Sequence, residues 1–423
     1  MRWMTLPLIM VVLAGLAYGF WPRGSASPSG GVEVAAVAAA LGQEARGATG
    51  AALAKRVLAF PDDHGAHPVA PAEVWDISVI LSDDARPELS LRLTLVRYAL
   101  ARRDASAGRD KDAAFGIDDQ TANEWSTIRR ASAFAADELL AGQLVIASDP
   151  SGPSITAERA SRAALGLAGT DDLKGGGARV WLEHWELVRE GDQLARVRAS
   201  GEGVELTLAL SPSKMPVSVD EVVFAGASED AATSLAGYSE PRFRVSGTVA
   251  VAGEVRELQG IGWLEHVWGS LAEALSGRRG QLVANRFRLQ LDDGVDLSCL
   301  HLRRRGGGGT PIPRCLLINV DGDRAVLRRR DLRLTAGDGR WMSTSGVQYP
   351  LDWRLVIPGR DLELRIVPLL KDRAMALRTL AIGGGAGQTW SGAVRVSGWR
   401  GSDELGGLGF MDLSGYAEAS TGT

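Results

Sequence analysis

The sequence predicts an all-β protein built from two domains. Short segments of alternating apolar and polar residues recur along the chain with turn residues between them, and long helical periods are few. The run Leu289–Val295 contains an Asp-Gly step of the kind that closes a β-hairpin. The chain of 423 residues is longer than one ordinary hydrophobic core allows, so two domains are expected. Together these observations favour antiparallel barrels or sandwiches.

Each domain carries its own series of predicted strands. The first domain is expected over residues 56–236 and the second over residues 237–423. The first series comprises Val74–Leu81, Glu88–Tyr98, Glu124–Phe134, Gly142–Ile146, Ala178–Arg189, Leu194–Ala199 and Val204–Leu210. The second comprises Phe243–Val251, Glu254–Trp263, Gln281–Leu291, Val295–Arg303, Arg314–Val320, Leu351–Ile357, Asp361–Pro368, Gln388–Ser397 and Gly409–Tyr416. Gly253 is expected to turn a hairpin, and the alanine-rich stretch Asp149–Lys174 to form a covering loop with a short helix.

The first 21 residues have the pattern of a targeting segment. Arg2 precedes an apolar run, Trp3–Trp21, of about 19 residues, which suits either a signal peptide or a membrane anchor. We favour an uncleaved N-terminal hydrophobic helix over cleavage. Residues 22–55, rich in Gly, Ala and Ser, are expected to be a linker. The rest of the chain would then be exported, periplasmic and tethered to the inner membrane.

Composition excludes some functions and leaves the cysteines open. The net charge of -4 is mild and there is no basic stripe, so no nucleic-acid partner is expected. Cys299 and Cys315 fit neither a metal site nor a disulfide framework. One bridge between them would suit an oxidising compartment, but two unpaired buried thiols are favoured.

A short phrase occurs twice in the chain. Trp181-Leu-Glu183-His-Trp185 returns as Trp263-Leu-Glu265-His266-Val-Trp268. If both copies are strands, each glutamate shares a face with a tryptophan and the histidine points to the other face. An acid buried among indole rings has a raised pKa and can donate a proton, while the rings stabilise a developing cation. The competing interpretation is structural: the acids bond backbone or an arginine, and the tryptophans fill the barrel.

A second group of polar and aromatic residues opens the first domain. His64 and His67 lie in the segment Phe60–Pro68, and Glu73 and Trp75 share one face of the strand that follows. Zinc would need a further ligand at tetrahedral reach, so no metal is expected. Hydrogen bonds from His64 to the loop backbone and a role in a pocket are both open.

Other chemistries find little support. The chain has no nucleophile elbow, no dinucleotide-binding or phosphate-binding fingerprint, and therefore no expected cofactor.

Several segments together resemble the AttH/carotenoid 1,2-hydratase (CrtC-like) family. These are Phe60–Pro68 leading to Glu73-Val-Trp75, Gly262–Ser270, Tyr349–Trp353 with Ile357-Pro358, Thr389–Gly392 and Gly409–Tyr416. The resemblance covers about residues 60–420, in the family's order. It implies two tandem lipocalin-like antiparallel β-barrels and a hydrophobic small-molecule ligand.

Two functional hypotheses follow. The first is an exported binding module for a hydrophobic or amphiphilic molecule or lipid, linked to an envelope transport system with an ABC transporter permease as partner. The second is a cofactor-free hydratase, isomerase or cyclase that protonates an alkene of an isoprenoid-like substrate. In the second, Glu265 is the acid, His266 or His64 positions water or the acid, and Trp263, Trp268 and Trp75 shield the cation. The other expected ligand-binding residues are Glu73, His67, Trp181, Glu183 and Tyr416.

Overall fold

The computed structural model describes nine ranges of the chain. They are residues 57–83, 86–100, 136–148, 154–218, 235–269, 282–304, 309–343, 346–370 and 389–416. The targeting segment, the linker and the predicted strand Glu124–Phe134 lie outside them. Within these ranges no helix has both the length and the apolar character needed to cross a bilayer.

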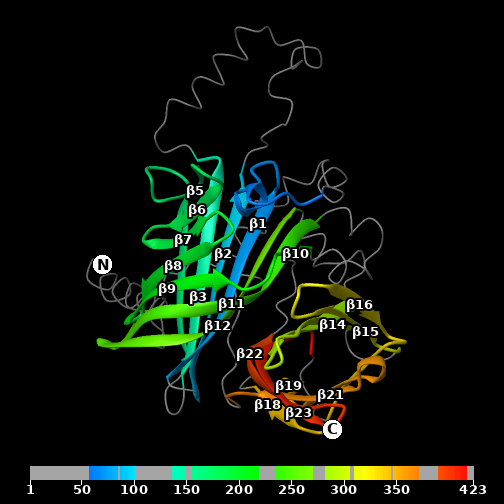
Figure 1. Cartoon of the computed structure of the whole chain (residues 1–423). Helices are drawn as coiled ribbons and strands as arrows, with labels where there is room; N and C mark the ends of the chain where they lie inside the picture. The colour runs from blue at the N-terminus through cyan, green and yellow to red at the C-terminus, as the bar shows by residue number, and fades with distance from the viewer. Residues whose placement is uncertain are drawn as a thin grey trace, which may run out of the picture. The chain divides into compact units, whose positions relative to one another are not determined.

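Antiparallel strands dominate the described residues, which confirms the all-β prediction (Figure 1). A twelve-stranded sheet, here called the first barrel, has the order β4-β3-β2-β1-β12-β11-β9-β8-β7-β6-β5, and β10 pairs with β11. Its strands are β1 (Ala72–Asp83), β2 (Arg86–Ala99), β3 (Glu138–Ser148), β4 (Ile155–Arg162), β5 (Ala168–Leu173), β6 (Gly177–Leu182), β7 (Trp185–Glu190), β8 (Leu194–Gly201), β9 (Val204–Pro212), β10 (Val217–Ser218), β11 (Leu235–Val251) and β12 (Glu254–Gly269).

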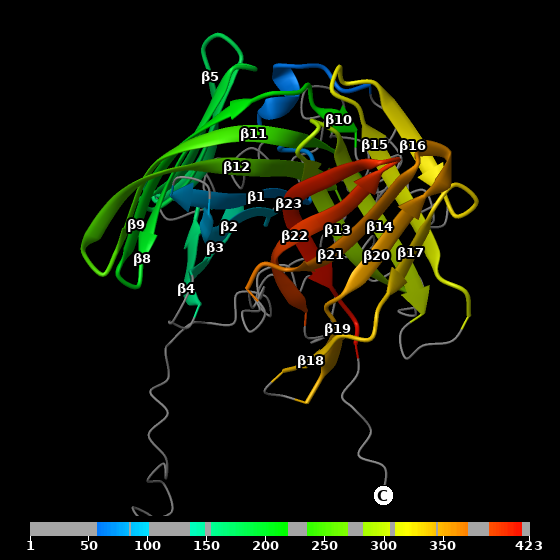
Figure 2. The same ribbon diagram turned by 60° about the horizontal axis from the view of Figure 1, so that its bottom comes forward.

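A nine-stranded sheet, the second barrel, has the order β16-β15-β14-β13-β23-β22-β21-β20-β17 (Figure 2, yellow to red). Its strands are β13 (Leu282–Leu291), β14 (Asp296–Arg304), β15 (Ile312–Ile318), β16 (Arg324–Arg328), β17 (Arg333–Ala336), β20 (Trp353–Ile357), β21 (Leu362–Pro368), β22 (Trp390–Arg400) and β23 (Asp403–Leu413). The short strands β18 (Arg340–Met342) and β19 (Gln348–Pro350) pair separately. The described helical elements are two single 3-10 turns, η1 (Asp62–His64) and η3 (Pro358–Arg360).

Burial patterns explain where each strand lies. In β8 buried and exposed residues alternate, so one face meets the core and the other meets solvent. In β1 the first ten residues are all buried. Trp75 and Ile77 pack into the core of the first barrel, while the intervening Asp76 faces charged residues of the second barrel. β1 is therefore covered on both faces.

The first sheet includes β11 and β12 and ends at Gly269. β11 and β12 form a long hairpin, and β12 pairs with β1, with Trp75 opposite His266. The change from the first sheet to the second thus comes after Gly269 and not at residue 236. The pairing of β12 with the distant β1 places β12 in the first sheet, and no local sequence pattern predicts that pairing.

Three local expectations were wrong. The stretch 149–174 contains β4 and β5, which form although alanine disfavours strands, because β3 and β6 supply partners. Ala178–Arg189 is not one strand but the hairpin β6–β7, with Glu183 at φ 56° in its turn. Cys299 and Cys315 lie opposite each other on β14 and β15 and form a disulfide, where unpaired thiols had been favoured. The predicted hairpins at Gly253 and at Leu289–Val295 are confirmed.

Candidate functional site

Six of the expected site residues converge inside the first barrel. His64 and His67 come from the loop that contains η1 and leads into β1, and Glu73 and Trp75 come from the start of β1. The register places Trp75 opposite His266 and Glu73 opposite Trp268 on β12. Residues paired directly across antiparallel strands share a face, so the cluster follows from the pairing of β1 with β12.

Glu73 is the centre of this cluster and is fully buried. Its Oε1 accepts hydrogen bonds from Nδ1–H of His67 at 2.8 Å and from Nε2–H of His266 at 2.7 Å. Its Oε2 accepts from Nε of Arg97 at 3.0 Å. Burial alone would raise the pKa of Glu73, but the hydrogen bonds from His266 and His67 and the charge of Arg97 hold it well below its usual range. Glu73 is thus an acceptor, not a proton donor.

Aromatic rings enclose His266. Its imidazole lies 4.8 Å from the ring of Trp75, nearly parallel to it, and 5.3 Å from the ring of Tyr238. Trp268 stacks on His67 with the ring centres 3.5 Å apart. Nδ1 of His266 is buried and has no hydrogen-bond partner among the described residues. Because Nε2–H donates to Glu73, Nδ1 is left as a free acceptor.

His64 forms a second polar pair with Tyr238 of β11. The Tyr238 hydroxyl donates to Nδ1 of His64 at 2.8 Å, and Nε2 of His64 lies 2.9 Å from Asp192 and 3.2 Å from Arg189. Burial, with the charge of Arg189, lowers the pKa of His64 to about 4, so the ring is neutral near pH 7. Burial raises the pKa of Tyr238 well above its usual value, and Glu240 adds to this.

A small cavity lies against this pair. It is lined by His64, Trp75, Ala178, Val180, Leu187, Arg189, Tyr238 and Leu264. Its free space holds about one water molecule. The walls are largely apolar and aromatic, and a few polar groups converge at one side, which is the usual composition of a small-molecule site.

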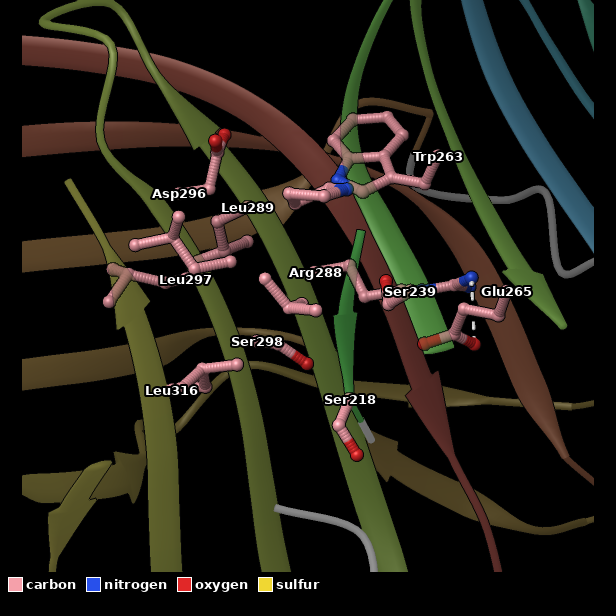
Figure 3. A pocket seen from close by; sticks show the side chains of 13 residues that line it. Ser218, Ser239, Trp263, Glu265, Arg288, Leu289, Asp296, Leu297, Ser298 and Leu316 are labelled. Carbon is pink, nitrogen blue, oxygen red and sulfur yellow. Dashed lines mark ion pairs between the residues drawn. The ribbon is translucent and has the colours of Figure 1, made fainter. Parts of the chain in front are cut away.

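Trp263 and Glu265 point to the opposite face of β12, toward the second barrel (Figure 3). Glu265 accepts from Arg286 at 2.5 Å and lies 3.5 Å from Arg288. The repeated phrase predicted a protonated acid beside indoles, whereas the Glu265 carboxylate lies buried between two guanidinium groups. Both residues line a second cavity, with room for about one or two water molecules, together with Ser239, Asp296 and other residues.

An ion network surrounds that face of β12. Arg92 binds Asp76 at 2.5 and 2.7 Å and Asp412 at 2.7 Å, and Arg288 lies 3.2 Å from Asp412 and 3.5 Å from Asp76. These four residues are at most 8% exposed, so each charge depends on its partners. The network joins β1 and β2 to β13 and β23.

Besides Trp263 and Glu265, three expected residues lie outside the cluster. Glu183 sits in the β6–β7 turn and pairs with Arg159 at a partly exposed position, because the turn breaks the alternation of a strand. Trp181 donates to the carbonyl of Gly166 near the barrel edge. Tyr416 lies in the second barrel, where its hydroxyl accepts from Asn285 at 3.0 Å.

Sequence reasoning missed Tyr238, Arg189, Asp192 and Arg97. Arg97 lies opposite Glu73 in the β1–β2 register, so correct pairing of those two predicted strands would have suggested it. The others come from β7, β11 and the turn after β7, and only the closure of the sheet brings them to His64. Among the described residues, one group has metal-binding potential: His67, Glu73 and His266.

Comparison with known proteins agrees with this architecture. The AttH-like family model matches residues 51–416. The chain belongs to the AttH-like family. A crystal structure of a Nitrosomonas europaea protein assigned to AttH is similar, with 25% identity, a TM-score of 0.64, and coverage of 86% of this chain and 98% of the other. Kievitone hydratase from Nectria haematococca shares the fold, with 12% identity, a TM-score of 0.51, and coverage of 88% and 96%. No curated protein matches the chain.

These matches bear on the fold of this AttH-like protein. The two barrels are lipocalin-like, as the resemblance implied. Because kievitone hydratase is only 12% identical, its likeness concerns the fold and does not carry its activity to this chain.

Proposed function

We propose that this AttH-like protein binds a hydrophobic or amphiphilic small molecule inside the first barrel. The observation that carries the proposal is the cavity bounded by Trp75, Tyr238, Val180, Leu187 and Leu264, with the neutral His64 at one side. The apolar part of the ligand would pack against the aromatic rings and aliphatic side chains of the wall. One hydroxyl or carbonyl group of the ligand would occupy the water-sized space beside His64 and Arg189. Because the cavity holds about one water molecule, any organic guest would require the wall side chains to move apart.

A cofactor-free hydratase or isomerase is the second candidate. Its support is the Tyr238–His64 hydrogen bond of 2.8 Å at the cavity wall and the free Nδ1 of the buried His266. A neutral imidazole that accepts from a phenol could relay a proton, and Trp75 could stabilise a cation formed by protonating an alkene. The polar pair, and not Glu265, is then the candidate proton carrier, since Glu265 is bound by two arginines.

Export to the periplasm, a membrane tether and service to an ABC-type transport system remain part of the proposal. The Cys299–Cys315 disulfide supports an oxidising compartment. The ligand would then be an envelope lipid or a related amphiphile.

Filling the cavity tests the proposal. Leu187→Phe places a larger side chain in the wall, and Val255→Phe makes a comparable change at a position that is 67% exposed. We expect the wild type to bind the fluorescent polyene cis-parinaric acid and to carry a lipid-like molecule in native mass spectra of protein purified from its own envelope. Leu187→Phe should weaken polyene binding at least about tenfold, and Val255→Phe should leave it unchanged.

Equal polyene affinity in the folded Leu187→Phe and Val255→Phe proteins would contradict the proposed location. For the second candidate, Tyr238→Phe should keep ligand affinity and lose turnover of an alkene substrate. Retained turnover would remove Tyr238 from the mechanism.

A further inference from the structure

Three side chains with metal-binding atoms meet beside the ligand cavity. Nδ1 of His67, a carboxylate oxygen of Glu73 and Nε2 of His266 all lie within 4.8 Å of one another. They come from the loop before β1, the start of β1 and the end of β12. The sequence does not reveal this group. His67 and Glu73 are close in the chain, but His266 lies almost 200 residues further on, in another hairpin.

The hydrogen bonds show how an ion could replace protons. Both imidazole N–H groups donate to the same oxygen, Oε1 of Glu73, at 2.8 and 2.7 Å. A zinc-type ion would bind the three atoms at about 2.0–2.1 Å and hold them about 3.3 Å apart. Each nitrogen would move about half an ångström away from Oε1, and the two nitrogens, which lie within 4.8 Å of each other, would approach to that separation. The ion would take the place of the proton that each ring directs at Oε1, and the ring N–H would then lie on Nε2 of His67, beside Asp63, and on Nδ1 of His266.

Neighbouring groups already orient two of these ligands. Nε2 of His67 lies 3.1 Å from Asp63, whose other carboxylate oxygen accepts from the backbone N–H of Ala59 at 2.6 Å. Arg97 holds Oε2 of Glu73 at 3.0 Å, which directs Oε1 toward the two imidazoles. A carboxylate behind a metal-bound histidine is the common outer arrangement in metal sites, because it fixes the ring and its tautomer.

We propose that His67, Glu73 and His266 bind one divalent transition-metal ion of the zinc type, with a fourth position open to water or a ligand. Two imidazoles and one carboxylate suit such an ion, whereas Mg²⁺ and Ca²⁺ prefer sites made of oxygen ligands alone. The His67 side chain keeps 10% exposure, so the ion can enter from that side, while Glu73 and His266 are wholly buried. The third ligand, His266, lies next to Glu73 only because β1 pairs with β12. The proposal does not depend on the identity of the organic ligand.

Metal uptake by the full chain tests this proposal. The protein would be purified with a tag that contains no histidine, stripped with a chelator and dialysed against Zn²⁺ or Co²⁺. We expect elemental mass spectrometry to find one equivalent of Zn²⁺ per protein chain. The Co²⁺ protein should show the visible absorption that is typical of tetrahedral sites. Glu73→Gln should weaken Zn²⁺ binding by more than about 100-fold. His301→Gln, which changes a buried histidine of the second barrel, should retain one equivalent.

Two results would overturn the site. One is a wild-type protein that retains no Zn²⁺ and gives no Co²⁺ absorption. The other is Zn²⁺ affinity unchanged by Glu73→Gln. If Glu73→Gln does not fold, His67→Gln replaces it, since that side chain lies at the edge of the cluster, and unchanged affinity in that variant has the same meaning.

Discussion

At the scale of single residues, the first barrel concentrates buried titratable groups around His266 and His64. Glu73 is held ionised by two histidines and Arg97, and His64 is held neutral by burial. Groups whose pKa values are driven apart by their surroundings are common at functional sites. Because burial changes these pKa values on folding, the free energy of unfolding should depend on pH.

The pH dependence of unfolding should report the neutral state of His64. Its pKa is about 4 in the folded protein and 6.5 unperturbed, so the unfolded chain takes up a proton first as pH falls. The effect of His64 on the free energy of unfolding is absent above about pH 6.5. Between pH 6.5 and 4 it destabilises the fold progressively, by up to about 3 kcal/mol. Urea unfolding at pH 7 and pH 4.5 should show a smaller loss in His64→Gln than in the wild type.

The variant comparison separates the effect of His64 from that of Glu240, which is present in both proteins. Burial raises the pKa of Glu240 to about 7 although Arg189 opposes it, so Glu240 contributes in the opposite sense over part of this range. Identical pH slopes for the two proteins would refute the neutral assignment.

At the scale of elements, β12 shows how one strand serves two surfaces. His266 and Trp268 face the interior of the first barrel, and Trp263 and Glu265 face the second. The first copy of the repeated phrase lacks this property, because it turns at Glu183 and leaves that side chain partly exposed. Near-identical sequence therefore gives a turn in one place and a buried strand in the other, according to the partners that each segment meets.

A glycine on β12 should be needed for the close approach of β1. A Cβ at Gly260 would lie 1.9 Å from the carbonyl oxygen of Ile80, which belongs to the backbone and cannot move independently. Gly260→Ala should lower the free energy of unfolding by roughly 2–4 kcal/mol. Gly359→Ala, where a Cβ meets nothing within 4 Å, should change it by less than about 0.5 kcal/mol. Chemical denaturation measures both, and equal stability of the two variants would show that the strands can separate freely.

At the scale of the whole molecule, buried ions join the two barrels. Apolar contacts add to the junction: Ile80 and Trp263 from the first barrel cluster with Phe410 and Ala393 from the second. The charges in this contact are largely removed from water, so each depends on a partner from the other barrel. Such a junction tolerates replacement of a whole pair better than removal of one member.

Asp412→Asn should therefore be strongly destabilising. The change leaves Arg92 and Arg288 without one shared carboxylate in a buried setting, and we expect a loss of about 3–5 kcal/mol in the free energy of unfolding. Glu363→Gln, which breaks the exposed pair with Arg354, should have little effect. Differential scanning calorimetry of both variants makes the comparison. A melting temperature of Asp412→Asn equal to that of Glu363→Gln would mean that water reaches the network.

Local pattern alone was sufficient for strands such as β1, β2 and β8 and for the hairpins at Gly253 and Asp293-Gly294, although it missed β4 and β5. The alternation of apolar and polar residues indicates which face of a strand is buried, and an Asp-Gly step indicates where the chain can turn. It could not decide which strands pair. The β1–β12 register, the turn at Glu183 and the Cys299–Cys315 pairing all join residues far apart in the chain or depend on their neighbours in space. Tertiary pairing therefore decided that His266 joins Glu73 inside the barrel while Glu265 turns outward to its arginines.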